Sequence, residues 1–349
     1  MDIVIFIVAL SVLILVHEFG HFFAAKKLGV KIEEFGMGLP PRIVGKKIGE
    51  TIYSLNWLPI GGFVRMFGEE KRQKSKRAFN NISPKKKIII VIGGVTMNLV
   101  LAVVIFGLVY KFMGIPVETE KVRVEEVAKN SPAEIVGIKT NDFILKVEGE
   151  KIKTPKELSE KVLKYKGKKV KLTVENNNQE KIVSLEVREK PPKGEGSMGV
   201  VITNIEMKKI GWGEFYLGIG EGFKEAFYWG KMILGGLGKM VSNLIRGEVP
   251  KDVAGPIGMY QATSMIKKNQ GLLGVMHFFG IISVNLAVVN ALPLPALDGG
   301  RLVFVLIELI FKKKINEDIE NKINTMGMIL LLSLIALITA GDIARLIRF

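Results

Sequence analysis

In the stretch His17-Glu-Phe-Gly-His21, two histidines and a glutamate follow an unbroken apolar run. On a helix the two histidines lie one turn apart on the same face, where each imidazole can donate a nitrogen to one Zn²⁺. Glu18 can take a proton from water and pass it to a leaving amine. The fourteen residues from Ile3 to Val16 are almost all apolar. The stretch therefore predicts a hydrolytic metal site inside a membrane span rather than in an open cleft.

The composition excludes several classes of protein. The 349 residues include three histidines and no cysteine, so disulfides, iron–sulfur clusters and thiol catalysis are ruled out. The net charge of +16 would suit a nucleic-acid partner, but its distribution does not. Residues 25–87 hold 15 Lys/Arg against five Asp/Glu, between two apolar runs. Such a basic loop is typical of the cytoplasmic side of a membrane protein, so we expect no nucleic-acid partner.

Four apolar runs predict four transmembrane helices: residues 3–25, 88–113, 272–311 and 326–346. Lys26 and Lys27 close the first run and no small-residue cleavage site follows, which favours a retained span over a signal peptide. The third run is too long for one straight span, and Leu292 to Gly300 interrupts it with two prolines. With the loop 25–87 and the basic turn Lys312–Lys314 cytoplasmic, both chain termini are expected outside.

Two stretches between the spans have a different character. Residues 205–250 are rich in aromatic side chains, but a central charge in a span costs about 2.5–3.5 kcal/mol, so they predict a helix in the membrane interface. Residues 117–190 alternate like strands and contain two helix starts, which predicts a soluble α+β module. The expected division is 1–114 and 271–349 for the membrane parts, 115–195 for the module and 196–270 for an interfacial amphipathic segment.

A catalytic zinc needs a third protein ligand, and the remaining candidates are His277, Asp298 and Glu308. Asp298 follows Pro293 and Pro295, and a broken backbone at membrane depth is tolerated only inside protein or beside a polar cavity. A carboxylate there, neutralised by a metal, explains both the break and the charge. A helix N-cap is the compatible alternative for Asp298, and packing near the outer membrane surface is the favoured interpretation of His277. About 21 Å of helix separates Ile3 from His17, which puts the site in the cytoplasmic half of a core about 30 Å thick.

These motifs resemble the site-2 protease family of intramembrane zinc metalloproteases, and most closely its bacterial regulator-of-sigma-E protease branch. The resemblance rests on His17–His21 and on Asn290-Ala-Leu-Pro-Leu-Pro-Ala-Leu-Asp-Gly299. Further matching stretches are Tyr53–Met66, Gly93–Asn98 and Val253–Gly258, and Asn130–Gly137 with Asn141–Gly149 in a module that looks like a PDZ domain. The resemblance covers nearly the whole chain.

The resemblance implies a polytopic α-helical membrane protein with four transmembrane helices, a membrane-associated β-loop at 50–68 and an inserted α+β PDZ domain. It implies one Zn²⁺ per chain, bound by His17, His21 and Asp298, with Glu18 as general base. Residues implied to hold an unwound substrate helix are Asn290, Pro293 and Pro295, together with Gly61, Gly62, Phe63 and Val64 of the β-loop. Arg301 stands where relatives often carry His, and it receives no catalytic role.

The resulting functional hypothesis is an intramembrane zinc endopeptidase for regulated intramembrane proteolysis, located in the bacterial cytoplasmic (inner) membrane. Its expected substrates are single-span proteins already shortened by a site-1-type protease, such as anti-sigma factors or remnant signal peptides. The PDZ domain would filter or dock them. The alternatives are a metal-binding transporter and a catalytically silent membrane scaffold. A transporter has no need of Glu18 beside a metal ligand, no inverted repeat is visible, and an intact Glu18 also disfavours a silent scaffold.

Overall fold

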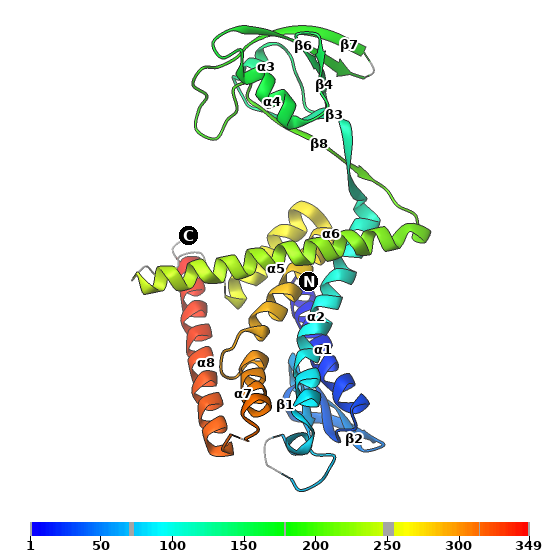
Figure 1. Cartoon of the computed structure of the whole chain (residues 1–349), viewed down its shortest axis with the longest axis vertical. Coiled ribbons are helices and arrows are strands. Elements are labelled where there is room, and N and C mark those ends of the chain that lie inside the picture. The colour runs from blue at the N-terminus through cyan, green and yellow to red at the C-terminus, as the bar shows by residue number, and fades with distance from the viewer. Residues whose placement is uncertain (1, 70–72, 178, 247–254, 314, 348–349) are drawn as a thin grey trace. The chain divides into compact units, whose positions relative to one another are not determined.

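The computed structural model describes residues 2–69, 73–177, 179–246, 255–313 and 315–347. The chain divides into two compact units, a module of Met113–Ile210 and a membrane unit built from the segments on either side of it (Figure 1). Residues 247–254 of the predicted interfacial segment, Lys314 of the basic turn and the start of the Val253–Gly258 match lie outside the described residues.

In the part of the chain that the structure describes, four helices are long and apolar enough to cross a bilayer: α1 (Asp2–Lys27), α2 (Pro84–Met113), α6 (Pro256–Ala291) and α8 (Glu317–Ile347). Large apolar side chains stay exposed along them, for example Val8 on α1 and Leu330 on α8, as lipid contact requires. The four predicted spans are confirmed. Figure 1 shows the start of α1 and the end of α8 at one end of the membrane unit and the β1–β2 sheet at the other.

The third apolar run is broken where two prolines predicted a break. Helix α6 ends at Ala291, and α7 (Asp298–Phe311) begins after a non-helical turn. A Cβ placed on Gly299 would lie 2.1 Å from the carbonyl oxygen of Leu292, so only glycine allows the chain to double back this tightly. Helix α6 also has non-helical backbone at Gly271, which separates its 256–270 part from the predicted span.

Asp298 does not act as a helix N-cap. Helix α7 begins at Asp298 itself, its N-cap residue is Leu297, and no side chain caps the helix end. The N-cap alternative is therefore wrong. The carboxylate of Asp298 instead faces the two histidines of α1.

Helix α5 (Phe215–Ile245), preceded by the 3₁₀ turn η2 (Trp212–Glu214), crosses the end of the helix bundle at which α1 begins (Figure 1). It is amphipathic and is not among the candidate spans, in agreement with an interfacial helix. Glu225 of α5 lies 2.6 Å from His277 Nε2 of α6 and also accepts a hydrogen bond from the Trp229 indole. His277 therefore holds α5 against α6, far in sequence from the metal motif.

Strands β1 (Ile32–Ile48) and β2 (Thr51–Met66) form the membrane-associated sheet, which is larger than the predicted loop 50–68. Both strands are irregular, so Phe35 pairs with Val64 on one side and with Tyr53 on the other. The segment 62–66 consequently forms an edge of this sheet within the described register. The 3₁₀ turn η1 (Phe79–Asn81) follows.

The buried Glu34 of β1 is held in its charged form. Burial raises the pKa of Glu34, but hydrogen bonds from Ser54 and Arg42 outweigh this effect and hold the pKa below its usual value.

The module is the expected α+β domain. Its sheet has the order β7-β6-β4-β3-β8, with β5 paired to β4. The elements are β3 (Ile115–Val127), α3 (Pro132–Ile135), β4 (Phe143–Val147), β5 (Glu150–Lys151), α4 (Pro155–Leu163), β6 (Lys169–Asn176), β7 (Gln179–Glu186) and β8 (Val200–Lys208). Ser131 and Thr154 cap the two helices by accepting hydrogen bonds from backbone N–H groups three residues on. Strand β8 lies beyond the predicted module range 115–195, in the range 196–270 that was predicted to be interfacial. Its place in the module is identified only by its pairing with β3, which the sequence does not show.

Candidate metal centre

Three side chains converge on one point between α1 and α7. His17 Nε2 lies 2.9 Å from Asp298 Oδ2, and His21 Nε2 lies 3.2 Å from the same oxygen. The two Nε2 atoms are 3.2 Å apart. Both histidines are buried, and the side chain of Asp298 is 14% exposed. The break before α7 therefore brings a carboxylate to the helix face that carries both imidazoles.

This geometry fits a zinc ion. Ligand atoms about 2.0–2.1 Å from a tetrahedral metal are separated by about 3.3 Å, close to the three distances here. Asp298 Oδ2 is buried and, among the described residues, no hydrogen bond satisfies it. An orphaned carboxylate oxygen beside two imidazole nitrogens is expected where a cation binds. Two imidazoles and a carboxylate leave a fourth position open, as in catalytic zinc sites.

A second layer of contacts orients the imidazoles. His21 Nδ1 lies 2.9 Å from the carbonyl oxygen of Ile90, so it donates a hydrogen bond and leaves Nε2 as the free lone pair. His17 Nδ1 lies 3.3 Å from the side-chain amide of Asn98, whose Oδ1 is buried and has no partner among the described residues. A 180° rotation of that amide lets Oδ1 accept from His17 Nδ1–H and satisfies both groups. Sequence reasoning gave neither α2 contact a role, although a lone asparagine in an apolar span was a usable signal.

Glycines bring α1 and α2 into close contact at the site. A Cβ placed on Gly20 would lie 2.2 Å from the carbonyl oxygen of Gly93, so the two backbones touch. A Cβ placed on Gly94 would lie 2.4 Å from His21 Nε2 and 2.8 Å from His17 Nε2. Gly94 thus leaves the space in which the two imidazoles meet the metal position.

A cavity of about 180 Å³ adjoins the three candidate ligands. It is lined by His17, Glu18, His21, Val64, Met66, Glu69, Asn290, Ala296, Leu297, Asp298 and Arg301. Glu18 thus faces the same space as the candidate ligands. A Cβ on Gly62 would lie 3.6 Å from Glu18 Cγ, so the edge segment of β2 passes directly beside this carboxylate.

The remaining predicted substrate-binding residues divide into two groups. Val64 and Asn290 line the cavity, and Phe63 lines an adjoining one. Gly61 has a positive φ of 95° and turns the chain into the edge segment. The other group does not line the cavity: Pro293 lies in the break before α7, and Pro295 packs against Gly327 of α8.

Sequence reasoning gave no role to two charged residues of this cavity, Glu69 and Arg301. Arg301 Nη1 lies 2.5 Å from Glu69 Oε1, and both side chains line the cavity. No sequence pattern joins them, because 232 positions separate the pair.

The chain matches one protein family and is similar to several proteins over nearly its whole length. The model of peptidase family M50 matches residues 5–334. A predicted zinc metalloprotease of Clostridium acetobutylicum is 37% identical over 348 residues, covering 100% of this chain and 99% of the relative. The corresponding protein of Campylobacter jejuni is 32% identical and covers 98% and 93%. The zinc metalloprotease RasP of Geobacillus kaustophilus is 27% identical and covers 99% and 98%.

Solved structures similar to the chain include PDZ domains of SdrC-like proteins from two Listeria species. The Listeria monocytogenes domain is 22% identical with a TM-score of 0.22, covering 25% of this chain and 90% of the domain. The Listeria innocua domain is 25% identical with a TM-score of 0.21, covering 24% and 92%.

Proposed function

The chain belongs to peptidase family M50, the site-2 proteases, and from that premise we propose that His17, His21 and Asp298 hold its zinc while Glu18 is its general base. Membership makes the protein a zinc metalloendopeptidase that acts on membrane proteins. The observation that carries the residue assignment is the convergence of three ligand atoms beside a cavity that Glu18 also lines.

The proposed chemistry is hydrolysis of a peptide bond. When bound, zinc polarises the scissile carbonyl and lowers the pKa of water at the open position. The Glu18 carboxylate takes a proton from the attacking water and delivers it to the nitrogen of the leaving segment. His17 and His21 present Nε2 as the ligand atom because their Nδ1 atoms face Asn98 and the Ile90 carbonyl, which fixes the orientation of each ring.

Substrate binding is proposed to use the sheet edge. A transmembrane helix hides its carbonyl groups, so cleavage requires local unwinding, and unwound backbone in lipid needs new hydrogen-bond partners. The edge segment Gly62–Met66 can supply them by strand addition beside Glu18. Asn290, which lines the same cavity, adds a side-chain amide. Gly61, Phe63, Pro293 and Pro295 are proposed to shape the segments that carry these groups.

The physiological setting is part of the same proposal. Substrates are single-span proteins already shortened by a site-1-type protease, such as anti-sigma factors or signal-peptide remnants, with a PDZ-type module as filter or docking site. The enzyme lies in the bacterial inner membrane with loop 25–87 cytoplasmic and both termini and the module outside. The basic loop and the common end of α1 and α8 support this orientation.

Cleavage of a tagged single-span substrate in detergent or liposomes tests the assignment. Wild type is compared with Glu18→Gln, and zinc stoichiometry is measured on the same samples. Glu221→Gln, on α5 and paired with Lys224, is the charge-matched control. We expect cleavage by wild type and control, none by Glu18→Gln, and about one zinc in all three. Turnover by Glu18→Gln at the wild-type rate would contradict the role of Glu18, and zinc-free wild type would contradict the ligand set.

A further inference from the structure

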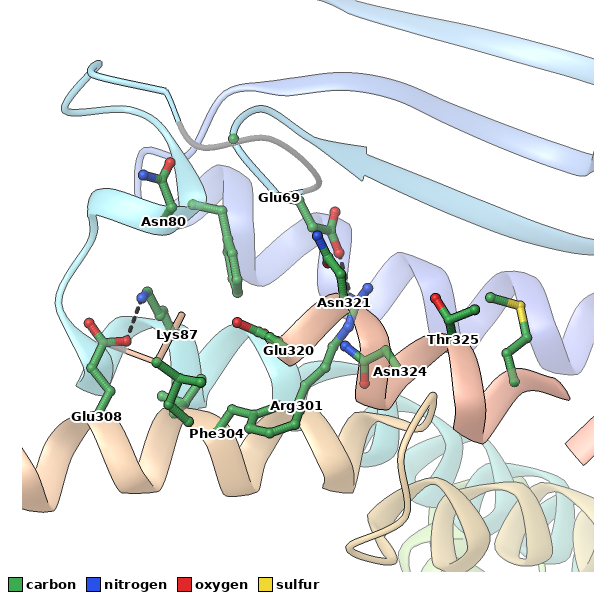
Figure 2. Close-up of a pocket in the computed structure, with 15 residues that line it drawn as sticks. Glu69, Asn80, Lys87, Arg301, Phe304, Glu308, Glu320, Asn321, Asn324 and Thr325 are labelled. Atoms are coloured by element: carbon green, nitrogen blue, oxygen red, sulfur yellow. Dashed lines mark hydrogen bonds and ion pairs between the residues drawn. The ribbon is translucent and has the colours of Figure 1, made fainter. Parts of the chain in front are cut away.

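The Glu69–Arg301 pair is the common wall of three cavities in the membrane unit. The cavity beside the candidate ligands holds about 180 Å³, a second holds about 300 Å³ and a third about 270 Å³. Glu69 and Arg301 line all three, and no other described lining residue does. Figure 2 shows the second cavity, with Arg301 reaching from α7 to Glu69. The pair therefore separates the proposed catalytic space from its neighbours.

The two partners are held differently. Glu69 Oε2 accepts a hydrogen bond of 3.1 Å from the backbone N–H of Met66, which fixes the carboxylate to the end of β2. The Glu69 side chain is 13% exposed, whereas the Arg301 side chain is 45% exposed. Arg301 can thus swing away while Glu69 keeps a partner. It lies three residues after Asp298, on the same face of α7 as the candidate ligand.

The charges around the proposed catalytic cavity are unequal. Glu18, Glu69 and Asp298 are acidic, and Arg301 is the single Lys or Arg among the described lining residues. Hydrolysis adds water across the C–N bond: the carbonyl carbon gains oxygen and becomes a carboxylate, and the nitrogen gains hydrogen and becomes an amine. The carboxylate is ionised at neutral pH, and an unpaired charge is costly at this membrane depth.

We infer that Arg301 is the receptor for the carboxylate created by cleavage, exchanging Glu69 for the new C-terminus of the product. The inference rests on the proposed function. A guanidinium can bind a carboxylate through two parallel hydrogen bonds, so the exchange replaces one paired anion with another. Movement of Arg301 also opens the wall toward the second cavity, whose polar lining includes Asn80, Asn321, Asn324 and Thr325 (Figure 2).

Binding of two peptides tests this receptor. Both carry a fluorescent label and the same apolar sequence, corresponding to the N-terminal product, and they differ only in ending as a free acid or as an amide. Affinities are measured on the zinc-loaded full chain in detergent. We expect wild type to prefer the acid by about 10- to 100-fold, the range of a charge-assisted hydrogen bond. Arg301→Gln should lower this acid-to-amide ratio at least about 10-fold, leaving only the contribution of the metal itself.

Two further variants make the test specific. Arg42→Gln removes the same charge from a side chain that is 42% exposed, pairs with Glu34 and lies outside the proposed substrate-binding segments, and it should keep the wild-type ratio. Glu69→Gln removes the competing carboxylate and should raise the affinity for the acid above that of wild type, the opposite of Arg301→Gln. A purely structural pair would weaken binding of both peptides in both variants.

An unchanged ratio in Arg301→Gln, an equal loss in Arg42→Gln, or weaker acid binding in Glu69→Gln would overturn the inference. If Arg301→Gln does not fold, the Glu69→Gln result decides alone. Substrate cleavage on the same wild-type preparation separates the two proposals. Cleavage without acid preference refutes the receptor and leaves the protease, whereas absence of cleavage and of zinc refutes the protease and the receptor together.

Discussion

Replacing Gly94 by alanine is expected to empty the metal centre while leaving the rest of the fold in place. A Cβ at this position would lie 2.4 Å from His21 Nε2 and 2.8 Å from His17 Nε2, whereas ordinary contacts begin near 3.4 Å. The added methyl group would therefore occupy the space toward which the Nε2 atoms of both candidate ligands point, and would prevent them from binding the metal together.

The size of the effect follows from these distances. To restore contact, His21 must retreat by about 1 Å, the difference between 3.4 and 2.4 Å. Metal–ligand bonds tolerate deviations of only about 0.2 Å, so the His21 nitrogen is lost as a ligand. Since disturbing an outer-layer partner alone costs about 10- to 100-fold in metal affinity, loss of a direct ligand should cost at least about 100-fold, or about 2.8 kcal/mol.

Zinc affinity measured by chelator competition on purified protein in detergent checks this value, with thermal unfolding as the measure of folding. Gly107→Ala on the same helix is the matched control. Its Cβ would lie 2.7 Å from Ile219 Cδ1, the far end of a flexible side chain, so zinc affinity should remain near that of wild type. A Gly94→Ala protein with wild-type zinc affinity and activity would refute the assignment of both histidines as ligands.

Three other perturbations report on separate parts of the structure. Asn98→Ala should weaken zinc binding about 10- to 100-fold by removing the partner of His17 Nδ1. Chelator competition measures this loss, and a variant that retains zinc as well as wild type at every chelator concentration would contradict the role of Asn98. Lys87→Met should destabilise the membrane unit by about 3–5 kcal/mol in detergent unfolding, because its 2.7 Å ion pair with Glu308 is mostly buried, and Lys87→Met/Glu308→Leu should recover most of the loss. Leu172→Ala should destabilise the module by about 2–5 kcal/mol by hydrogen exchange, and lost zinc in that variant would argue against two independent units.

Local patterns predicted the membrane helices well. Apolar runs fixed four spans because a helix in lipid must be apolar along its whole length, and the prolines after Asn290 marked the break before α7. Hydropathy did not show that α6 continues back to Pro256, since residues 256–270 are mixed in character and form a separate helix before Gly271. The first strand of the membrane sheet was missed for a related reason. Its Pro, Gly and charged residues hide an alternating pattern that pairing with β2 stabilises.

The candidate site was predictable where its geometry is helical and unpredictable where it depends on tertiary contacts. The spacing of His17 and His21 places them on one face whatever the fold, and the charge of Asp298 at a membrane break pointed to a third ligand. The neighbours of these side chains come from distant segments: Asn98 is 81 positions from His17, and Arg301 is 232 positions from Glu69. No local signal encodes such contacts, so the pairing of these residues emerged only from the structure.

The inserted module begins and ends on two neighbouring strands. Ile115 at the start of β3 pairs with Lys208 at the end of β8, so the chain leaves the module beside the point where it enters. The two ends of the insertion are therefore separated only by the distance between two paired strands, and this separation does not depend on the length of the segment between them. The module can therefore be lengthened, duplicated or exchanged without altering the spacing of the candidate metal ligands, and under the proposed filter role such a change would alter which proteins are admitted.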